Sequence, residues 1–202
     1  MDTTELPCPK QTKNHQSLVS GLQWIVTIGQ FDVMTALMTL SSFRAAPHMG
    51  HLKQAKRICG CLSKVRSATI HVQTEQPDCS DLPVPEFNWL QLVCCAVEEI
   101  LPDNAPPPVG ECVTLTHCVD ANLMNNLVTG QSVTGIFPLL NKTLLDCFSK
   151  KQSTVEIATY SSEMLAACAC VEQIIDPSIS LRCMGFPVHQ KSSVFGDNES
   201  VV

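Results

Sequence analysis

Three features are absent or scarce in this sequence of 202 residues: CxxC pairs, long apolar runs and basic charge. No two of the twelve cysteines have the CxxC spacing, which argues against the common zinc-binding and dithiol redox motifs. No uninterrupted apolar run reaches about 18 residues, so we expect no membrane span. Lys and Arg number 13 against 19 Asp and Glu, a net charge of -6 that does not favour autonomous nucleic-acid binding.

The twelve cysteines are abundant for a chain of this length, and their context indicates thiols. The N-terminal stretch MDTTELPCPK has no apolar segment of the secretory type, so we expect an intracellular protein, cytoplasmic or nuclear, with reduced and mostly buried cysteines. Cys112, His117 and Cys118 are ligand types close together in sequence. On a strand, however, residues 117 and 118 point to opposite faces, so zinc is not expected there.

Residues 1–74 are expected to be mainly helical. The first 14 residues are polar and contain two prolines, which predicts disorder. Apolar residues then recur at helical spacing over 15–28, 32–45 and 50–65, with Gly29 and Pro47 suited to end the first two helices. The alternation in 68–74 predicts a strand.

Residues 75–110 differ from their surroundings in composition. They contain seven of the thirteen prolines, including Pro106–Pro108, and several acidic residues. We interpret this stretch as a linker, within which the apolar run Trp89–Val97 packs locally at most. Two basic clusters, 53–57 in the helical region and 150–151 beyond the linker, are interpreted as solvated surface.

Residues 111–202 show the two-residue period of strands. Strands are expected over 112–119, 132–140, 144–148 and 192–195, with a tight turn at Asn141-Lys142. A helix is expected over 160–176, stopped by Pro177, with a weaker helical piece over 178–184. The whole chain is therefore predicted to be an α/β protein of the mixed α+β kind: a helical region followed by three antiparallel strands, a helix and a returning strand.

Three carboxylates stand at comparable places in these elements. Asp120 ends the first strand, Glu163 lies in the first turn of the helix, and Asp197 follows the last strand. Strand ends and a helix packed on the sheet can bring such side chains together, and hydrolysis of a phosphodiester by two metal ions needs oxygen ligands around ions about 3.5–4 Å apart. On the helix, Glu163 shares an otherwise apolar stripe with Ala167, Cys170 and Ile174, where an unpaired charge is costly.

Each carboxylate alone has a simpler interpretation. An Asp at a strand end is most often a turn residue, and a Glu near a helix start is most often a favourable partner of the helix dipole. Only the combination of all three, in this order and on these elements, favours a metal site.

Several segments resemble the ribonuclease H domain of copia-type retrotransposon polyproteins. These are VDAN, TGQSVTG, SKKQST, SSE and GDNES, at Val119–Asn122, Thr129–Gly135, Ser149–Thr154, Ser161–Glu163 and Gly196–Ser200. Upstream, Gln16–Trp24, Thr27–Val33 and Ala55–Ile58 are similar to the thumb-like helices and connection of the reverse transcriptase in the same polyproteins. Cysteines stand where that family commonly has aromatic residues, which is typical of a degraded copy; they include Cys61, Cys79, Cys118 and Cys147.

The resemblance implies a function and a set of site residues. Asp120, Glu163 and Asp197 would be the first, second and third ligands of two Mg²⁺ or Mn²⁺ ions that cut the RNA strand of an RNA–DNA hybrid. The domains would be a thumb/connection-like region over 1–74, a linker over 75–110 and a partial ribonuclease H-like domain over 111–202. The polymerase portion would be a missing partner, and the domain would lack its last helix and a fourth metal ligand.

Two functions follow from these expectations. The chain is a fragment of the retrotransposon enzyme that is weakly active or inactive as it stands, or it is a non-catalytic remnant that serves as an interaction module for protein or nucleic acid.

Overall fold

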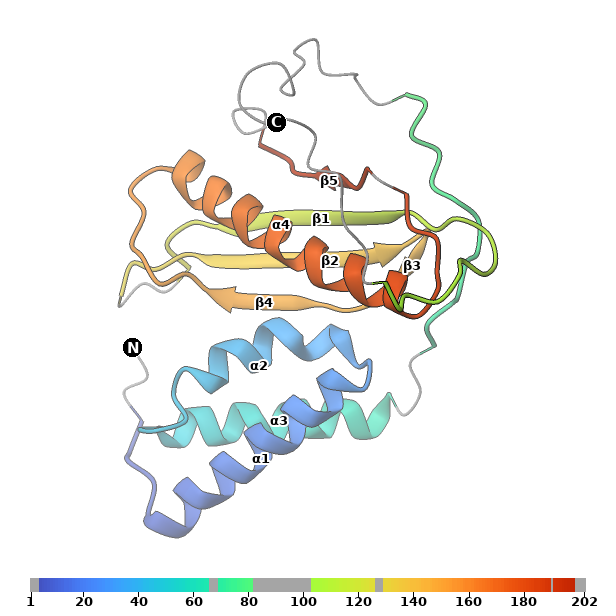
Figure 1. Ribbon diagram of the computed structural model, residues 1–202. Coiled ribbons are helices and arrows are strands. Elements are labelled where there is room, and N and C mark those ends of the chain that lie inside the picture. Colours follow the sequence, from blue (N-terminus) through green and yellow to red (C-terminus); the bar gives the residue numbers. More distant parts are fainter. Residues whose placement is uncertain (1–3, 66–68, 82–102, 126–128, 190, 199–202) are drawn as a thin grey trace.

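The computed structural model describes residues 4–65, 69–81, 103–125, 129–189 and 191–198. The described chain is a mixed α/β protein with four α-helices and one five-stranded mixed sheet (Figure 1). The N-terminal elements are α1 (Pro9–Thr27), η1 (Phe31–Val33), α2 (Met34–Ser41) and α3 (Met49–Lys64). They are followed by β1 (Leu115–Asn122), β2 (Val133–Leu140), β3 (Thr143–Leu144), β4 (Phe148–Lys151), α4 (Thr159–Cys183) and β5 (Ser193–Phe195).

The sheet has the order β3-β2-β1-β5, and β4 pairs with the same edge of β2 as β3 does. β1 pairs with β2 in antiparallel register and with β5 in parallel register. α4 lies across one face of the sheet against β1 and β2 (Figure 1). The strand that leads to Asp197 is therefore the neighbour of the strand that carries Asp120, as predicted.

The core consists of two separate clusters of buried side chains. One joins α1, η1, α2 and α3 around Val19, Leu22 and Leu40, and the other joins β1, β2 and α4 around Ile136, Ala166 and Cys170. α2 lies alongside β4, so the two regions meet at the edge of the sheet (Figure 1).

The helical region departs from expectation at two boundaries. α1 begins at Pro9, so residues 9–14 are helical and not disordered, while residues 1–3 lie outside the described part. Pro9 suits the first turn of a helix because its fixed backbone angle and missing N–H cost nothing there. The second helix is shorter than predicted, because residues 31–33 form a separate 3₁₀ turn. Gly29 follows α1 with a φ of 112°, a conformation that glycine adopts without strain.

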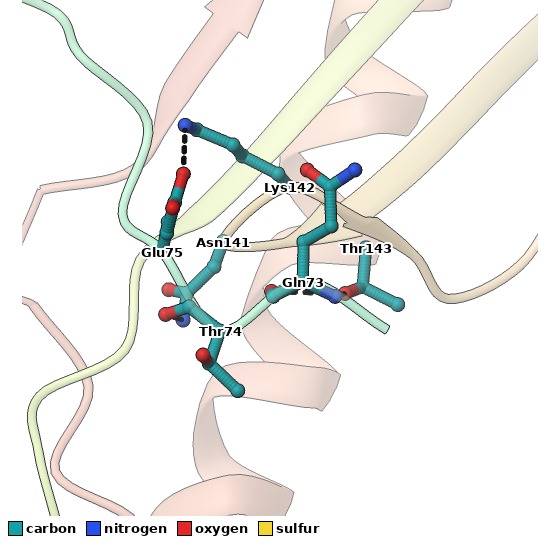
Figure 2. Close-up of polar contacts among 6 residues, drawn as sticks. All are labelled: Gln73, Thr74, Glu75, Asn141, Lys142 and Thr143. Atoms are coloured by element: carbon teal, nitrogen blue, oxygen red, sulfur yellow. Dashed lines mark hydrogen bonds and ion pairs between the residues drawn. The ribbon is translucent and has the colours of Figure 1, made fainter. Parts of the chain in front are cut away.

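The strand predicted over 68–74 is wrong for the described residues 69–74, which form no regular strand. This segment instead lies against the turn between β2 and β3 (Figure 2). The backbone of Gln73 exchanges hydrogen bonds with the hydroxyl of Thr143, at 2.7 and 3.1 Å, and Asn141 Nδ2 donates to the carbonyl of Thr74 at 2.9 Å. Side chains thus satisfy the backbone groups that a strand would pair in a ladder.

The same turn is held by two further contacts. Lys142 Nζ lies 2.9 Å from the Glu75 carboxylate, and the backbone N–H of Thr114 donates to Asn141 Oδ1 at 2.9 Å. The start of the predicted linker is therefore attached to the sheet. Most of that linker, including the run Trp89–Val97, lies outside the described residues.

Two predictions in the sheet region are also wrong. The third strand, expected over 144–148, is two short strands, β3 and β4. Between them the Cys147 N–H donates to its neighbour Asp146 at 2.7 Å, a local bond that interrupts the ladder.

Pro177 does not stop α4, which continues to Cys183. The helix tolerates the proline while packing on β1 and β2. By length and composition, α4 would also suffice to cross a membrane, contrary to the expectation of no such segment. Its Ala166 and Cys170, however, are fully buried against the sheet.

Candidate metal centre

The structure brings the three predicted carboxylates together. Asp120 is near the end of β1, Glu163 is in the first turns of α4, and Asp197 follows β5. One ligand oxygen from each lies within 4.8 Å of those of the other two. Parallel pairing of β1 with β5 and packing of α4 on β1 create this proximity, because the three residues are far apart in sequence.

The three side chains differ in exposure. Asp120 and Asp197 are exposed, whereas Glu163 retains only 7% of its accessible surface. Glu163 occupies the sheet-facing side of α4 with Ala166 and Cys170. In the predicted stripe Cys170 is buried with Glu163, whereas Ala167 and Ile174 are partly buried. The arrangement is an open acidic cluster with one buried member beneath two that face solvent.

Burial and like charge act together on Glu163. Desolvation is the largest cause that raises the pKa of its carboxyl, followed by the negative charges of Asp120 and Asp197. The backbone N–H of Ala121 acts in the opposite direction and lowers the pKa of Glu163. A buried carboxylate among other carboxylates is unfavourable unless a positive charge compensates it.

Among the residues that the structure describes, no side chain supplies that compensation. In the ranges that the structure describes, none of the three carboxylates forms an ion pair with Lys or Arg. A small, mainly apolar hollow of about 220 Å³ adjoins Glu163 and is lined in part by Val119, Val171 and Val194.

The donor set fits a hard divalent cation. All three donors are carboxylate oxygens, which Mg²⁺ and Mn²⁺ prefer over nitrogen and sulfur ligands. Among the described residues no fourth Asp, Glu, His or Cys joins the group. The remaining coordination positions would fall to water or to the ligand, as is usual for Mg²⁺.

Cys112, His117 and Cys118 do not form a metal-binding group. His117 is fully buried, while its neighbour Cys118 is exposed, so the two side chains point to opposite faces as expected. Both ring nitrogens of His117 are buried and have no hydrogen-bond partner among the described residues, and this burial lowers the pKa of the imidazole. Sequence reasoning did not anticipate this buried, unpaired histidine, although its alternation with Leu115 and Val119 was a visible signal.

Comparisons of this chain with protein-family models, with curated proteins and with solved structures give no match. The geometry of the acidic cluster therefore carries the functional argument.

Proposed function

We propose that the acidic cluster is a divalent-cation site of the ribonuclease H type, in a chain of copia-type retrotransposon lineage. Asp120, Glu163 and Asp197 would hold Mg²⁺ or Mn²⁺, and the substrate of that lineage is the RNA strand of an RNA–DNA hybrid. The observation that carries the proposal is the convergence of three carboxylates from β1, α4 and the end of β5, none of which forms an ion pair within the described residues. The order of the elements and the parallel β1–β5 pairing support the same fold assignment.

Each residue has a distinct task in this proposal. The exposed Asp120 and Asp197 face the side from which a phosphate group would approach. Glu163 lies deeper, and the sheet-facing side of α4 keeps it in place. A bound divalent cation would supply Lewis-acid chemistry that activates water and neutralises charge on the phosphate.

We expect cation binding to be easier to detect than cleavage. Two-ion hydrolysis needs both ions held within about half an ångström of their working positions, which demands more ligands than one compact group provides. The described part of the chain brings three carboxylates to this point. We therefore propose a cation-binding domain that cuts hybrid weakly or not at all on its own.

The test combines thermal unfolding with a nuclease assay. Mn²⁺ and Mg²⁺ should raise the melting temperature of the parent protein, because a ligand that binds only the folded state stabilises it. They should have no such effect on the Asp120→Asn or Glu163→Gln variants. An equal shift in parent and variants would refute the site.

The nuclease assay uses a labelled RNA–DNA hybrid, with Asp120→Asn as the control for contaminating nuclease. Little or no cutting by the parent is expected. Robust cutting that the control variant loses would show that these three carboxylates are sufficient for catalysis.

The second candidate function is a protein-interaction module, and the outer side of α4 favours it. Val171, Ile175 and Ile179 are about half exposed and follow one another at four-residue spacing, so they form an apolar row on one side of the helix. Val171→Asp with Ile175→Asp should abolish any self-association or partner binding that uses this row. If this double variant leaves such binding unchanged, the row is not the interface.

A further inference from the structure

A cleft separates the helical region from the edge of the sheet. It has a volume of about 660 Å³ and lies where α2 runs beside β4 (Figure 1). Its floor is apolar and includes Val26 and Leu37, and its rim is polar. The polar lining residues are Gln23, Thr27, Ser41, Ser42, Ser149, Lys150 and Lys151.

The charge of this cleft is opposite to that of the whole chain. Of the described residues, Lys150 and Lys151 are the only charged ones that line it and no Asp or Glu does, although acidic residues outnumber basic ones in the sequence. A smaller hollow of about 190 Å³ between β4 and α4 is lined by both lysines and, within the described part of the chain, by no acidic residue. Both sides of β4 are therefore locally cationic.

The two lysines are available to an outside ligand. In the described ranges neither ammonium group forms an ion pair. Lysines on an edge strand often serve to prevent pairing with another chain. Here α2 already covers the edge of β4. Protection of that edge is therefore not enough to explain why β4 carries two lysines.

The register of the sheet relates these lysines to the acidic cluster. Asp120 pairs with Gly135 on β2, and Gly135 pairs with Ser149 on β4, directly before Lys150. Neighbouring strands lie about 4.8 Å apart, so β4 is about 10 Å from β1. A nucleic-acid strand advances about 3.4 Å per nucleotide, so 10 Å corresponds to roughly three nucleotides.

A chain of contacts also connects the end of β4 to the helix that carries Glu163. Gln152, directly after β4, is buried, and its Nε2 donates to the Ser162 carbonyl at 2.8 Å and to Thr134 Oγ1 at 3.1 Å. Ser162 immediately precedes Glu163. The cationic strand and the acidic cluster are thus held in a fixed relation.

We propose that Lys150 and Lys151 bind the phosphodiester backbone of a nucleic acid, about three nucleotides from the phosphate that reaches the acidic cluster. This rests on the proposed function and adds a second, non-catalytic contact that sets where the strand lies. The proposal gives a binding role to residues 150–151, which the sequence analysis interprets as solvated surface. An acidic protein segment could also pair with the positive charge of the two lysines. The fixed spacing between the lysines and the acidic cluster favours a nucleic acid instead, because its phosphates repeat along the strand.

The experiment measures binding of a short labelled RNA–DNA hybrid by fluorescence anisotropy, without divalent cations, at several salt concentrations. The test variant is Lys150→Gln with Lys151→Gln. The matched control is Lys53→Gln with Lys56→Gln, which removes two exposed lysines from α3. Melting temperatures of all three proteins show whether the fold is intact.

We expect the test variant to bind about tenfold more weakly, and the slope of log affinity against log salt to fall by about two. The control variant should bind like the parent. Equal losses in both variants, or no loss in the test variant, would overturn the inference. Lysine-dependent binding of a labelled glutamate-rich peptide without binding of the hybrid would also overturn it.

The cation-dependent melting shift keeps this inference separate from the proposed function. If divalent cations raise the melting temperature as expected but hybrid binding does not depend on the lysines, only the proposed backbone contact is refuted. If divalent cations do not raise the melting temperature but hybrid binding depends on the lysines, only the cation site is refuted and the backbone contact remains supported.

Discussion

In the metal-free protein the charge of Glu163 is unfavourable for two reasons. Its side chain is buried on the sheet side of α4, and it lies close to two other carboxylates. Its raised pKa means that the folded state holds the proton more tightly than the unfolded state does. This group's contribution to the free energy of unfolding is fully present below the ordinary pKa of 4.5. It is lost as pH rises through the pKa of Glu163 in the folded state.

Glu163→Gln should therefore stabilise the metal-free protein near neutral pH while it removes the response to Mn²⁺. We expect a gain of about 0.5–1 kcal/mol in the free energy of unfolding, because the amide keeps the shape and removes the charge. The advantage over the parent should shrink below pH 4.5, where the parent carboxyl is protonated too. Denaturant unfolding between acidic and neutral pH measures this, and a variant less stable than the parent at neutral pH contradicts it.

His117 places a second titratable group in the core. It is fully buried, its ring nitrogens have no hydrogen-bond partner in the part of the chain that the structure describes, and burial lowers its pKa below the ordinary 6.5. The unfolded state thus binds a proton at a higher pH than the folded state does. The contribution of neutral His117 to the free energy of unfolding is therefore fully present above pH 6.5. It falls as pH decreases toward the pKa of His117 in the folded state.

His117→Leu should reduce the loss of stability on acidification below pH 6.5. One histidine contributes at most about 1.4 kcal/mol per pH unit in that range, so the slope should fall by up to this amount. His189→Leu, at an exposed position, is the control and should leave the slope unchanged. Part of the slope should remain in the His117 variant, because burial also lowers the pKa of His15 in the helical cluster. Identical acid profiles for the parent and His117→Leu would contradict this account.

At the scale of single elements, α4 is the piece that connects the acidic cluster to the core. Its first turns hold Glu163, and its middle packs on β1 and β2. Pro177 interrupts its hydrogen bonding, since proline has no N–H to donate to the carbonyl four residues earlier. The Ser178 hydroxyl donates to the Ile174 carbonyl at 2.7 Å in the same turn.

Pro177→Ala should stabilise the protein, because it restores a hydrogen bond and removes a steric conflict inside the helix. The expected gain is up to about 3 kcal/mol in the free energy of unfolding. Pro187→Ala, beyond the end of α4, serves as the control and should bring no such gain. Thermal or denaturant unfolding decides the matter, and a destabilised Pro177→Ala variant would mean that α4 requires the proline for its packing.

At the scale of the whole molecule, the two hydrophobic clusters share no buried residue. The regions nevertheless meet where α2 runs beside β4 and where Gln73–Glu75 are held by the turn after β2. Separate cores predict separate local stabilities, since opening free energies follow the contacts within each unit.

Leu22→Ala should increase amide hydrogen exchange within residues 9–64 and leave residues 115–183 largely protected. The reciprocal variant, Ile136→Ala, should do the reverse. Both side chains are essentially fully buried, so each truncation should cost about 2–5 kcal/mol in its own cluster. A uniform rise in exchange across both regions after either change would show one cooperative unit.

Local pattern was sufficient for most elements and for the identity of the acidic residues. Strand alternation around Asp120, the apolar stripe below Glu163 and the short strand before Asp197 predicted three elements that the structure contains. The sequence pattern gave a wrong prediction where side chains replace backbone pairing, as at Gln73 and Thr143. It was also wrong at Pro177, where the packing of α4 outweighs the tendency of proline to end a helix. These contacts join residues distant in sequence, so no window of sequence contains them.

The sequence by itself determined most of the helices and strands and the acidic residues at their ends, because periodicity and local hydrogen bonding act over a few residues. Only the tertiary structure decided that Asp120, Glu163 and Asp197 share one point in space, and that Lys150 and Lys151 border a cleft two strands away. The physical reason is that strand pairing and helix packing set distances between distant residues, and those distances determine the charge and solvation of each site.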